Sequence, residues 1–540
     1  MKKMFFVFWL LFLGSLLPAQ TEPAWMWASR AGGNTNYYDE AKAIVSDSAG
    51  NSYITGHFFG TAYFGATSLV SAGLRDVFVA KLDPSGNWLW AVRGGGTGHD
   101  YGNGISLDNS GNIYITGSFY SSASFGVFNL NGGGLFDMYA AKLSSSGTWL
   151  WAKQAGSNLS DVGNGISTDA DGFSHVTGYF NSTVSFGTTA LVSAGSEDIY
   201  AAKLDPWGNW VWAKRAGGSG YDAGFGISLD TGGNSHVTGS FSSTASFGTG
   251  SLVSNSGTDD IFAAKLSPSG SWLWASGAGG ANIDYGLGIS TDSAGNSYLS
   301  GSFNSTASFG ATSLTSAGLF DLVIAKLDPS GNWLWARRAG SASGNDHAYC
   351  VSSDASGNCY LGGYFTATAL FGTVSLTSSG AEDCFAARLD SAGNWLWAKR
   401  GGGIGYDAAL GVDSGIGGNG HLTGTFGVTA SFGAFTITCS GMRDVFAALI
   451  SPGAPANPDA PQNIVGTQFE THIALSWDAV TGAGGYRVYI CDTPEGTYQQ
   501  LLYVAGTSVD VTWAQIIDMG FPDADGQAFF RVTADTAAPR

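Results

Sequence analysis

A pair of tryptophans separated by one residue recurs along most of the chain. The pairs start at Trp25, Trp88, Trp149, Trp210, Trp272, Trp333 and Trp395, so consecutive pairs begin 61 to 63 residues apart. Residues two apart in a β-strand point to the same side, so each pair places two indole rings on one face of a strand. Burial of one ring removes about 150–250 Å² from water, at about 25 cal/mol per Å². Any fold of this chain must therefore bury two indoles in every repeat.

Each repeat predicts four short strands joined by tight turns. In the repeat from Asp284 to Trp335 we expect strands at residues 284–290, 298–303, 321–327 and 333–335. The turns are of the type Asp-x-x-Gly-Asn, at Asp292–Asn296 and Asp328–Asn332, where glycine allows a positive φ. A Ser/Thr/Gly-rich link that begins at a Phe-Gly pair joins the second strand to the third. One repeat is therefore a small antiparallel sheet.

Every part of this unit occurs seven times. The third strand begins at Asp76, Asp137, Asp198, Asp260, Asp321, Asp383 and Asp444, and the Phe-Gly pairs begin at Phe64, Phe125, Phe186, Phe247, Phe309, Phe371 and Phe432. Four strands with a period near 61 residues indicate a β-propeller, because stacked sheets cover each other's faces around an axis. The sequence predicts an all-β protein whose main domain, residues 24–452, is a seven-bladed β-propeller of four-stranded blades.

The two ends of the repeat region predict how the propeller closes. Trp25 and Trp27 come before any first, second or third strand, and no tryptophan pair follows Asp444–Ala448. We expect the N-terminal segment to supply the fourth strand of the last blade, which leaves no free edge. Within a blade we expect the first strand, glycine-rich around Asn103, to lie innermost and the tryptophan strand outermost.

The chain resembles the bacterial β-propeller repeat family known as SBBP over about residues 24–450. The motifs that carry the resemblance are the Asp-x-x-Gly-Asn turn, Tyr/His-x-Thr-Gly, and Asp-x-Phe-x-Ala-Lys-Leu-Asp-Pro-Ser-Gly-Asn followed by tryptophan. The resemblance implies export and surface display. It brings no catalytic residues to this chain.

The N-terminus has the pattern of a secretory signal peptide, residues 1–19. Lys2 and Lys3 precede an apolar run from Met4 to Leu17, which is shorter than the roughly 20 residues of a spanning helix. Its removal leaves 21 basic and 41 acidic residues. A net charge of −20 makes nucleic acid an improbable partner. We expect a secreted or cell-surface monomer.

A smaller domain follows the propeller. Residues 453–460 are a proline-rich linker. Leu475–Trp477, Tyr486–Ile490 and Phe529–Ala534 are similar to the B, C and F strands of a fibronectin type III domain, which predicts a small β-sandwich at 461–540. The chain ends soon after the F-like strand, so we expect the last strand to be shortened or missing.

The cysteines leave two alternatives. The chain has five: Cys350, Cys359, Cys384, Cys439 and Cys491. Export permits disulfides, and the first three fall within one repeat, so one bridge among them is an alternative. The odd number favours buried free thiols.

Seven aspartates, called here the first-strand aspartates, are the candidate metal ligands. They are Asp39, Asp100, Asp161, Asp222, Asp284, Asp346 and Asp407. If the first strand is innermost they form a ring at one mouth of the channel and could hold a cation. The alternative, which we favour because every blade has one, is that each carboxylate accepts backbone N–H bonds from its own loop.

Departures from the repeat are the better candidates for specificity. Trp207 replaces serine in an Asp-x-x-Gly-Asn turn and is the candidate ligand-binding residue; Phe225, His347 and Tyr349 alter the first strand. The other histidines offer no metal or nucleophile partner: His175, His236 and His421 stand where other blades have tyrosine.

The function prediction follows from what is missing as well as from the fold. No nucleophile-elbow, zinc-helix or phosphate-loop motif occurs in the sequence. We expect no cofactor and a non-catalytic scaffold that binds or displays an extracellular glycan or protein. The alternatives are an extracellular enzyme acting on polysaccharide or protein, and a purely structural surface or adhesion spacer.

Overall fold

The structure, a computed structural model, describes residues 22–33, 37–248 and 250–453 and six strands between Val465 and Asp535. The chain divides into two compact units: one comprises Pro23–Pro452, and the other comprises Met1–Glu22 with Gly453–Arg540. The predicted signal peptide and most of the predicted linker lie outside the described residues. Among the described residues, no helix has the length and apolar character needed to cross a membrane.

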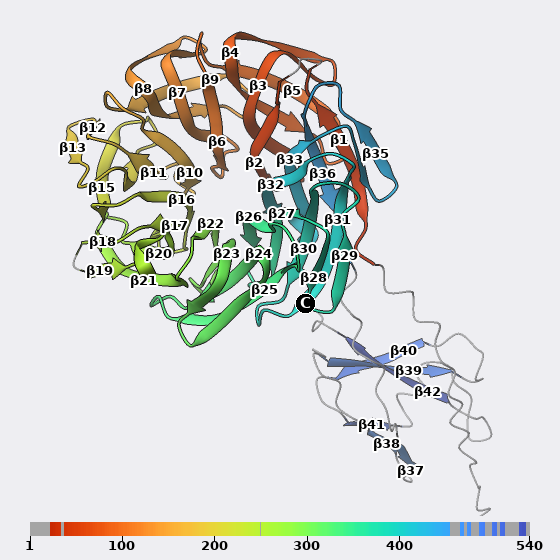
Figure 1. Cartoon of the computed structure of the whole chain (residues 1–540). Helices are drawn as coiled ribbons and strands as arrows, with labels where there is room; N and C mark the ends of the chain where they lie inside the picture. Colours follow the sequence, from red (N-terminus) through yellow and green to blue (C-terminus); the bar gives the residue numbers. More distant parts are fainter. Residues whose placement is uncertain are drawn as a thin grey trace, which may run out of the picture. The chain divides into compact units, whose positions relative to one another are not determined.

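The larger unit is built from antiparallel sheets that follow one another around a common centre (Figure 1). The first contains β2 (Glu40–Ser46), β3 (Ser52–Phe64), β4 (Thr67–Leu82) and β5 (Trp88–Gly94), in that order. The second repeats it with β6 (Asp100–Leu107), β7 (Ile113–Phe125), β8 (Phe128–Leu143) and β9 (Trp149–Ala155). The unit is an all-β, propeller-like fold.

The same strand order continues along the chain. The third group of four contains β10 (Val162–Thr168), β11 (Ser174–Phe180), β14 (Asp198–Leu204) and β15 (Trp210–Gly218), and the fourth contains β16 (Asp222–Leu229), β17 (Ser235–Phe241), β20 (Asp260–Leu266) and β21 (Trp272–Gly280). The fifth contains β22 (Asp284–Thr291), β23 (Ser297–Phe309), β24 (Thr312–Leu327) and β25 (Trp333–Ser341). The sixth contains β26 (His347–Ser353), β27 (Cys359–Phe365), β30 (Asp383–Leu389) and β31 (Trp395–Gly403). In each sheet the glycine-rich strand is first and the tryptophan strand fourth.

One sheet joins the two ends of this unit. It has the order β32 (Asp407–Ser414), β33 (Gly420–Phe426), β36 (Asp444–Ile450) and β1 (Trp25–Ala31). β1 runs antiparallel to β36, with Arg30 opposite Phe446. The N-terminal tryptophan strand is therefore the fourth strand of the sheet whose other three strands come from the end of the unit.

The link between the second and third strands differs from the sequence expectation. It is a β-hairpin whose first strand ends at the phenylalanine of the Phe-Gly pair, and the glycine, with φ between +58° and +64°, begins the turn. Four of these hairpins are separate strand pairs: β12 (Thr183–Phe186) with β13 (Thr189–Val192), β18 (Thr244–Phe247) with β19 (Gly250–Val253), β28 (Thr368–Phe371) with β29 (Val374–Thr377), and β34 (Thr429–Phe432) with β35 (Phe435–Thr438). There are also two short 3₁₀ turns: η1 (Asn255–Gly257) lies between β19 and β20, and η2 (Ile416–Gly418) lies between β32 (Asp407–Ser414) and β33 (Gly420–Phe426). Most of the hairpins also pair with the fourth strand of the preceding sheet, as β18 does with β15.

The tryptophan pairs join neighbouring sheets in both directions. The second indole of a pair donates its N–H to the turn of the following sheet, as Trp27 Nε1 does to the carbonyl of Pro84 at 3.0 Å. The first donates to the fourth strand of the preceding sheet, as Trp88 Nε1 does to the carbonyl of Arg30 at 3.0 Å. The hydrophobic core lies between adjacent sheets, so the indoles add hydrogen bonds to a contact that is otherwise apolar.

The smaller unit contains two three-stranded antiparallel sheets. One has the order β37 (Val465–Gln468), β38 (His472–Ser476) and β41 (Ser508–Thr512); the other has β40 (Gln499–Val504), β39 (Gly485–Cys491) and β42 (Phe529–Asp535). The three strands expected from the sequence fall on β38, β39 and β42.

Four cysteines are described with their side chains, and all are free thiols. Cys359 and Cys384 are buried, and Cys350 and Cys439 are half-buried. No bridge therefore joins the three cysteines that share one repeat.

Candidate binding site at the centre of the propeller

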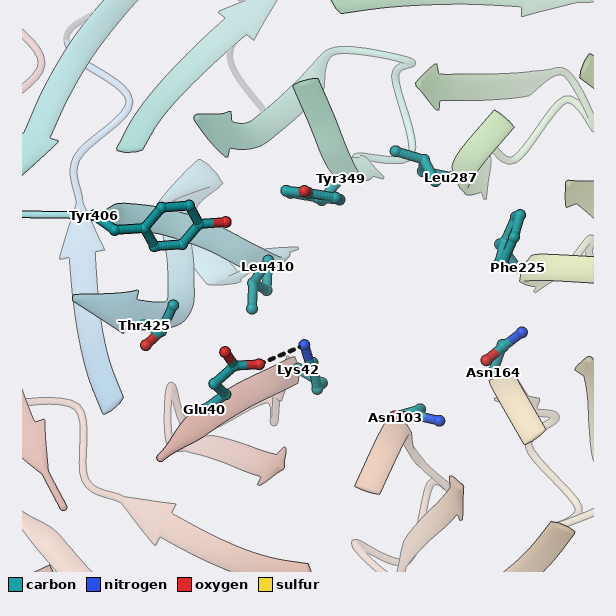
Figure 2. A pocket seen from close by; sticks show the side chains of 10 residues that line it. All are labelled: Glu40, Lys42, Asn103, Asn164, Phe225, Leu287, Tyr349, Tyr406, Leu410 and Thr425. Atoms are coloured by element: carbon teal, nitrogen blue, oxygen red, sulfur yellow. Dashed lines mark ion pairs between the residues drawn. The ribbon is translucent and has the colours of Figure 1, made fainter. Parts of the chain in front are cut away.

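The first strand of every sheet in the larger unit contains a β-bulge. In β2 the pairing with β3 passes from Ala41 to Ala43 and skips Lys42. The skipped residues, called here the bulge residues, are Lys42, Asn103, Asn164, Phe225, Leu287, Tyr349 and Leu410. A bulge re-aims the extra side chain, and all seven line one central cavity of about 320 Å³ (Figure 2).

Small residues flank the bulge residues because the first strands of adjacent sheets approach closely. A Cβ added at Gly165 would lie 3.1 Å from the backbone nitrogen of Ile227, and one at Gly104 would lie 3.1 Å from the backbone nitrogen of Ile166. Both distances are shorter than ordinary contacts. The glycines therefore allow the first strands to surround a narrow cavity, and the variable residue between them supplies its lining.

The bulge residues divide the cavity wall into two parts. Lys42, Asn103 and Asn164 form the polar arc, which comes from three consecutive sheets. The remaining four form the apolar arc: Phe225, Leu287, Tyr349 and Leu410. Figure 2 shows the two arcs on different sides of the cavity. A ligand in this cavity would contact hydrogen-bonding groups on one side and aromatic or aliphatic groups on the other.

The two asparagines of the polar arc are held by the neighbouring strand. Asn103 Nδ2 donates to the carbonyl of Gly163, and Asn164 Nδ2 donates to the carbonyl of Gly224, both at 2.9 Å. Because these bonds use an N–H of each amide, they orient the amide and leave its oxygen as the acceptor for a ligand. In Figure 2 the amide oxygen of Asn164 points toward the cavity.

An ion pair completes the polar side. Lys42 Nζ lies 2.7 Å from Oε2 of Glu40, and Arg443 lies 3.9 Å from the other oxygen. Burial pushes the pKa of Glu40 upward, but the electrostatic interactions with Lys42, His57 and Arg443 and the hydrogen bond from Lys42 together outweigh it, so the pKa falls below its ordinary value. Burial lowers the pKa of the neighbouring His57 to about 3. At neutral pH Glu40 is therefore a carboxylate, and the neighbouring imidazole of His57 is neutral.

Aromatic rings packed at a tilt support the apolar side. Tyr349 lies 5.8 Å from Tyr364, which lies 5.8 Å from Tyr406. The guanidinium of Arg443 lies 3.6 Å from the ring centre of Tyr406, a cation–π distance. Burial raises the pKa of all three tyrosines, so their hydroxyls stay protonated and can donate. Figure 2 shows the hydroxyl of Tyr406 directed into the cavity.

The first-strand aspartates lie elsewhere. All seven are buried, and none lines the cavity. Each carboxylate accepts backbone N–H groups: Asp222 accepts from Gly218 at 2.7 Å and from Ser242 at 3.3 Å. Among the residues that the structure describes, no group of three or more His, Cys, Asp or Glu side chains could hold a metal ion. A cation at the first-strand aspartates stays a prediction.

A second carboxylate lies near each first-strand aspartate. Gly217 separates Asp222 from Asp198, which begins the third strand of the preceding sheet. A Cβ at Gly217 would lie 2.6 Å from Oδ1 of Asp198 and 2.9 Å from Oδ2 of Asp222. Burial is the main cause that raises the pKa of Asp222 to about 7, and Asp198 adds to it. The two groups form a buried acid pair between sheets.

Trp207 is 73% exposed, in the turn between β14 and β15, and is not part of the cavity wall. Its role in ligand binding stays a prediction. Sequence reasoning noticed Phe225 and Tyr349 as departures from the repeat but missed the cavity. The available signal was the small-x-small pattern of the first strand, in which x ranges from lysine and asparagine to leucine, phenylalanine and tyrosine.

Repeated four-stranded antiparallel sheets around a central cavity define a β-propeller repeat protein. Comparison with known proteins agrees: residues 92–118 match the family model described as a beta-propeller repeat, SBBP. The chain is also 22% identical to an uncharacterised WD repeat-containing protein of Acanthamoeba polyphaga mimivirus, over 72% of this chain and 35% of that protein. The chain thus covers about a third of the length of this curated relative.

Proposed function

We propose that the protein is an exported, non-catalytic binding or display scaffold: a closed seven-bladed β-propeller that carries a fibronectin type III-like module. One observation carries the proposal. Residues that repeat in every sheet serve the fold, as turns, hairpins and indole bonds do, whereas the bulge residues differ from sheet to sheet and meet in one cavity. Chemically different side chains that meet in one shared cavity are suited to recognition of a ligand.

The sheet pairing supports the architecture. Each first strand contributes one bulge residue to the cavity, and these come from seven repeats. The pairing of β1 with β36 supports closure, because it gives the last blade its fourth strand. The two three-stranded sheets of the smaller unit support the fibronectin-like assignment.

The chemistry of the cavity supports a non-catalytic role. Of its ten lining residues, Glu40 is the one carboxylate, and it is paired with Lys42 at 2.7 Å. Hydrolysis of a glycosidic bond ordinarily needs two carboxyl groups that flank the bond. A secreted or surface location rests on the signal-like N-terminus.

The test is a ligand screen on the full-length chain. Melting temperature is measured against panels of saccharides, peptides and small apolar acids, for the wild type, Phe225→Ala and Trp207→Ala. We expect a hit whose stabilisation is lost in Phe225→Ala and kept in Trp207→Ala. Chemical conversion of a stabilising compound would favour the enzyme alternative. If the stabilisation is unchanged in Phe225→Ala, the cavity is not the binding site.

The export part is tested separately. Mass spectrometry of the protein made in a secreting host gives its N-terminal residue. We expect a mature chain that begins near residue 20, outside the cytoplasm. An intact N-terminus on a protein retained in the cytoplasm would contradict export and leave the binding role standing.

A further inference from the structure

We infer that the central cavity binds a neutral saccharide of one or two sugar units, with the apolar arc against the C–H face of a sugar ring and the polar arc on its hydroxyl groups. This inference rests on the proposed binding function and names its ligand class.

The polar groups of the cavity wall include both acceptors and donors. The amide oxygens of Asn103 and Asn164 and the carboxylate of Glu40 accept hydrogen bonds. The ammonium of Lys42 and the hydroxyls of Tyr349 and Tyr406 can donate, and the hydroxyl of Thr425 also lines the wall. Hydroxyl groups both donate and accept, so a ligand rich in hydroxyls satisfies this mixture with one kind of group.

The charges of the cavity argue against an ionic ligand. An anion drawn to Lys42 would also meet Glu40 and the two amide oxygens, and a cation drawn to Glu40 would meet Lys42 and Arg443. Either ion would have to break an existing pair and leave one buried charge without its partner, which is costly. A neutral polar ligand can bond to both members of the pair without separating them.

The apolar arc presents flat surfaces. Figure 2 shows the rings of Phe225 and Tyr349 nearly edge-on, with Leu287 between them along this wall. Leu287 and Leu410 fill the remainder of this wall. A pyranose has the matching shape: hydroxyls around its edge and a C–H surface on its face. A fully apolar ligand would leave the amide oxygens and the ion pair unsatisfied.

The size of the cavity limits the ligand. Its volume of about 320 Å³ is near the lower end of the roughly 300–1,000 Å³ typical of small-molecule sites. The cavity therefore has room for one or two sugar rings, and a longer saccharide would have to extend out of it.

The experiment is isothermal titration of the full-length chain with glucose, galactose, mannose and N-acetylglucosamine and with maltose, cellobiose, lactose and diacetylchitobiose. The variants are Phe225→Ala and Asn164→Leu. Their matched controls are Trp207→Ala and Asn129→Leu, which change exposed residues away from the cavity. We expect at least one saccharide to bind, and each cavity variant to weaken its affinity about tenfold or more, because a buried group loses its partner.

A blocking variant keeps the test decisive if a cavity variant fails to fold. Leu287→Trp adds bulk to the wall and removes no polar group; we expect it to abolish saccharide binding while the circular dichroism spectrum stays that of the wild type. The inference is overturned if no saccharide binds, or if binding survives the cavity variants. Binding of a peptide or an apolar acid that is lost in Phe225→Ala would overturn the saccharide inference alone. If no compound of the ligand screen or of the saccharide titration loses binding in the cavity variants, the proposed binding function is overturned as well.

Discussion

The indole hydrogen bonds predict how strongly one tryptophan holds its neighbouring sheet. Trp212 is 8% exposed, and its Nε1 donates to the carbonyl of Pro268, in the turn of the following sheet, at 3.0 Å. Trp212→Phe keeps an aromatic ring and removes this bond. Trp212→Ala removes the ring as well.

The expected magnitudes follow from these contacts. Pro268 is exposed, so water can replace the indole and the lost bond costs about 0.5–1.5 kcal/mol. The smaller ring loses about 1 kcal/mol of apolar burial. Trp212→Phe should therefore lower the free energy of unfolding by about 1.5–2.5 kcal/mol. Trp212→Ala should lower it by about 3–5 kcal/mol, as for other buried aromatic truncations.

The assay is equilibrium unfolding in guanidinium chloride, followed by circular dichroism because fluorescence would change with every tryptophan removed. The transition of the larger unit is fitted separately from any transition of the smaller one, since two-state analysis applies to single units. Trp207→Phe, at a 73% exposed position, is the control and should stay within about 0.5 kcal/mol. If Trp212→Phe unfolds at the wild-type midpoint, the bond to Pro268 does not hold the sheets together. If Trp212→Phe lowers the free energy of unfolding as much as Trp212→Ala does, the aromatic ring contributes nothing beyond the hydrogen bond.

Three further outcomes follow from the contacts between sheets. Burial raises the pKa of Asp222 to about 7, so its folded form binds a proton more tightly than its unfolded form. This contribution to stability is complete below the unfolded pKa of about 4 and is lost as pH rises through 7. Asp222→Asn should therefore be most destabilising near pH 4 and progressively less so toward pH 8 in denaturant titrations; an equal cost at every pH would contradict the buried acid pair. Gly165→Ala should cost about 1–3 kcal/mol, because its Cβ would press on Ile227 at 3.1 Å. The control is Gly250→Ala, where a Cβ meets nothing within 4 Å. If the two variants unfold at the same denaturant midpoint, the first strands have space for a Cβ at Gly165. Because the first-strand aspartates accept backbone N–H groups, treatment with a chelator should leave the melting temperature unchanged, and a clear fall would instead indicate a bound cation.

Much of the local structure was predictable from short motifs. The Asp-x-x-Gly-Asn turns formed as expected: in the turn at Asp83 the carboxylate accepts the N–H groups of Ser85 and Asn87 at 2.9 Å, and Gly86 has φ of 82°. These contacts join residues at most four apart, so the sequence contains all the partners. The order of strands within a sheet was predictable for a related reason, since glycine suits a crowded centre and tryptophan does not.

The Phe-Gly hairpins show where local reasoning failed. Their sequence, for example Thr244–Phe247 and Gly250–Val253, is short and rich in small residues, and from the sequence we expected only a Ser/Thr/Gly-rich link there, with no strands. In the structure Gly217 and Gly218 of the preceding sheet pair with Ser246 and Ala245. These partners lie nearly thirty residues away, so no local pattern could indicate the pairing.

The sequence by itself determined the unit of construction: a repeat of about 61 residues with four strands, two tight turns and a pair of indoles. Only the tertiary structure decided what the variable residues do. Lys42 and Tyr349 are 307 positions apart, yet both line one cavity because each occupies the bulge of a first strand and the first strands surround a common centre. Spacing along a chain fixes periodicity, whereas convergence in space depends on how many sheets pack side by side and at what angle, which is set by contacts between repeats.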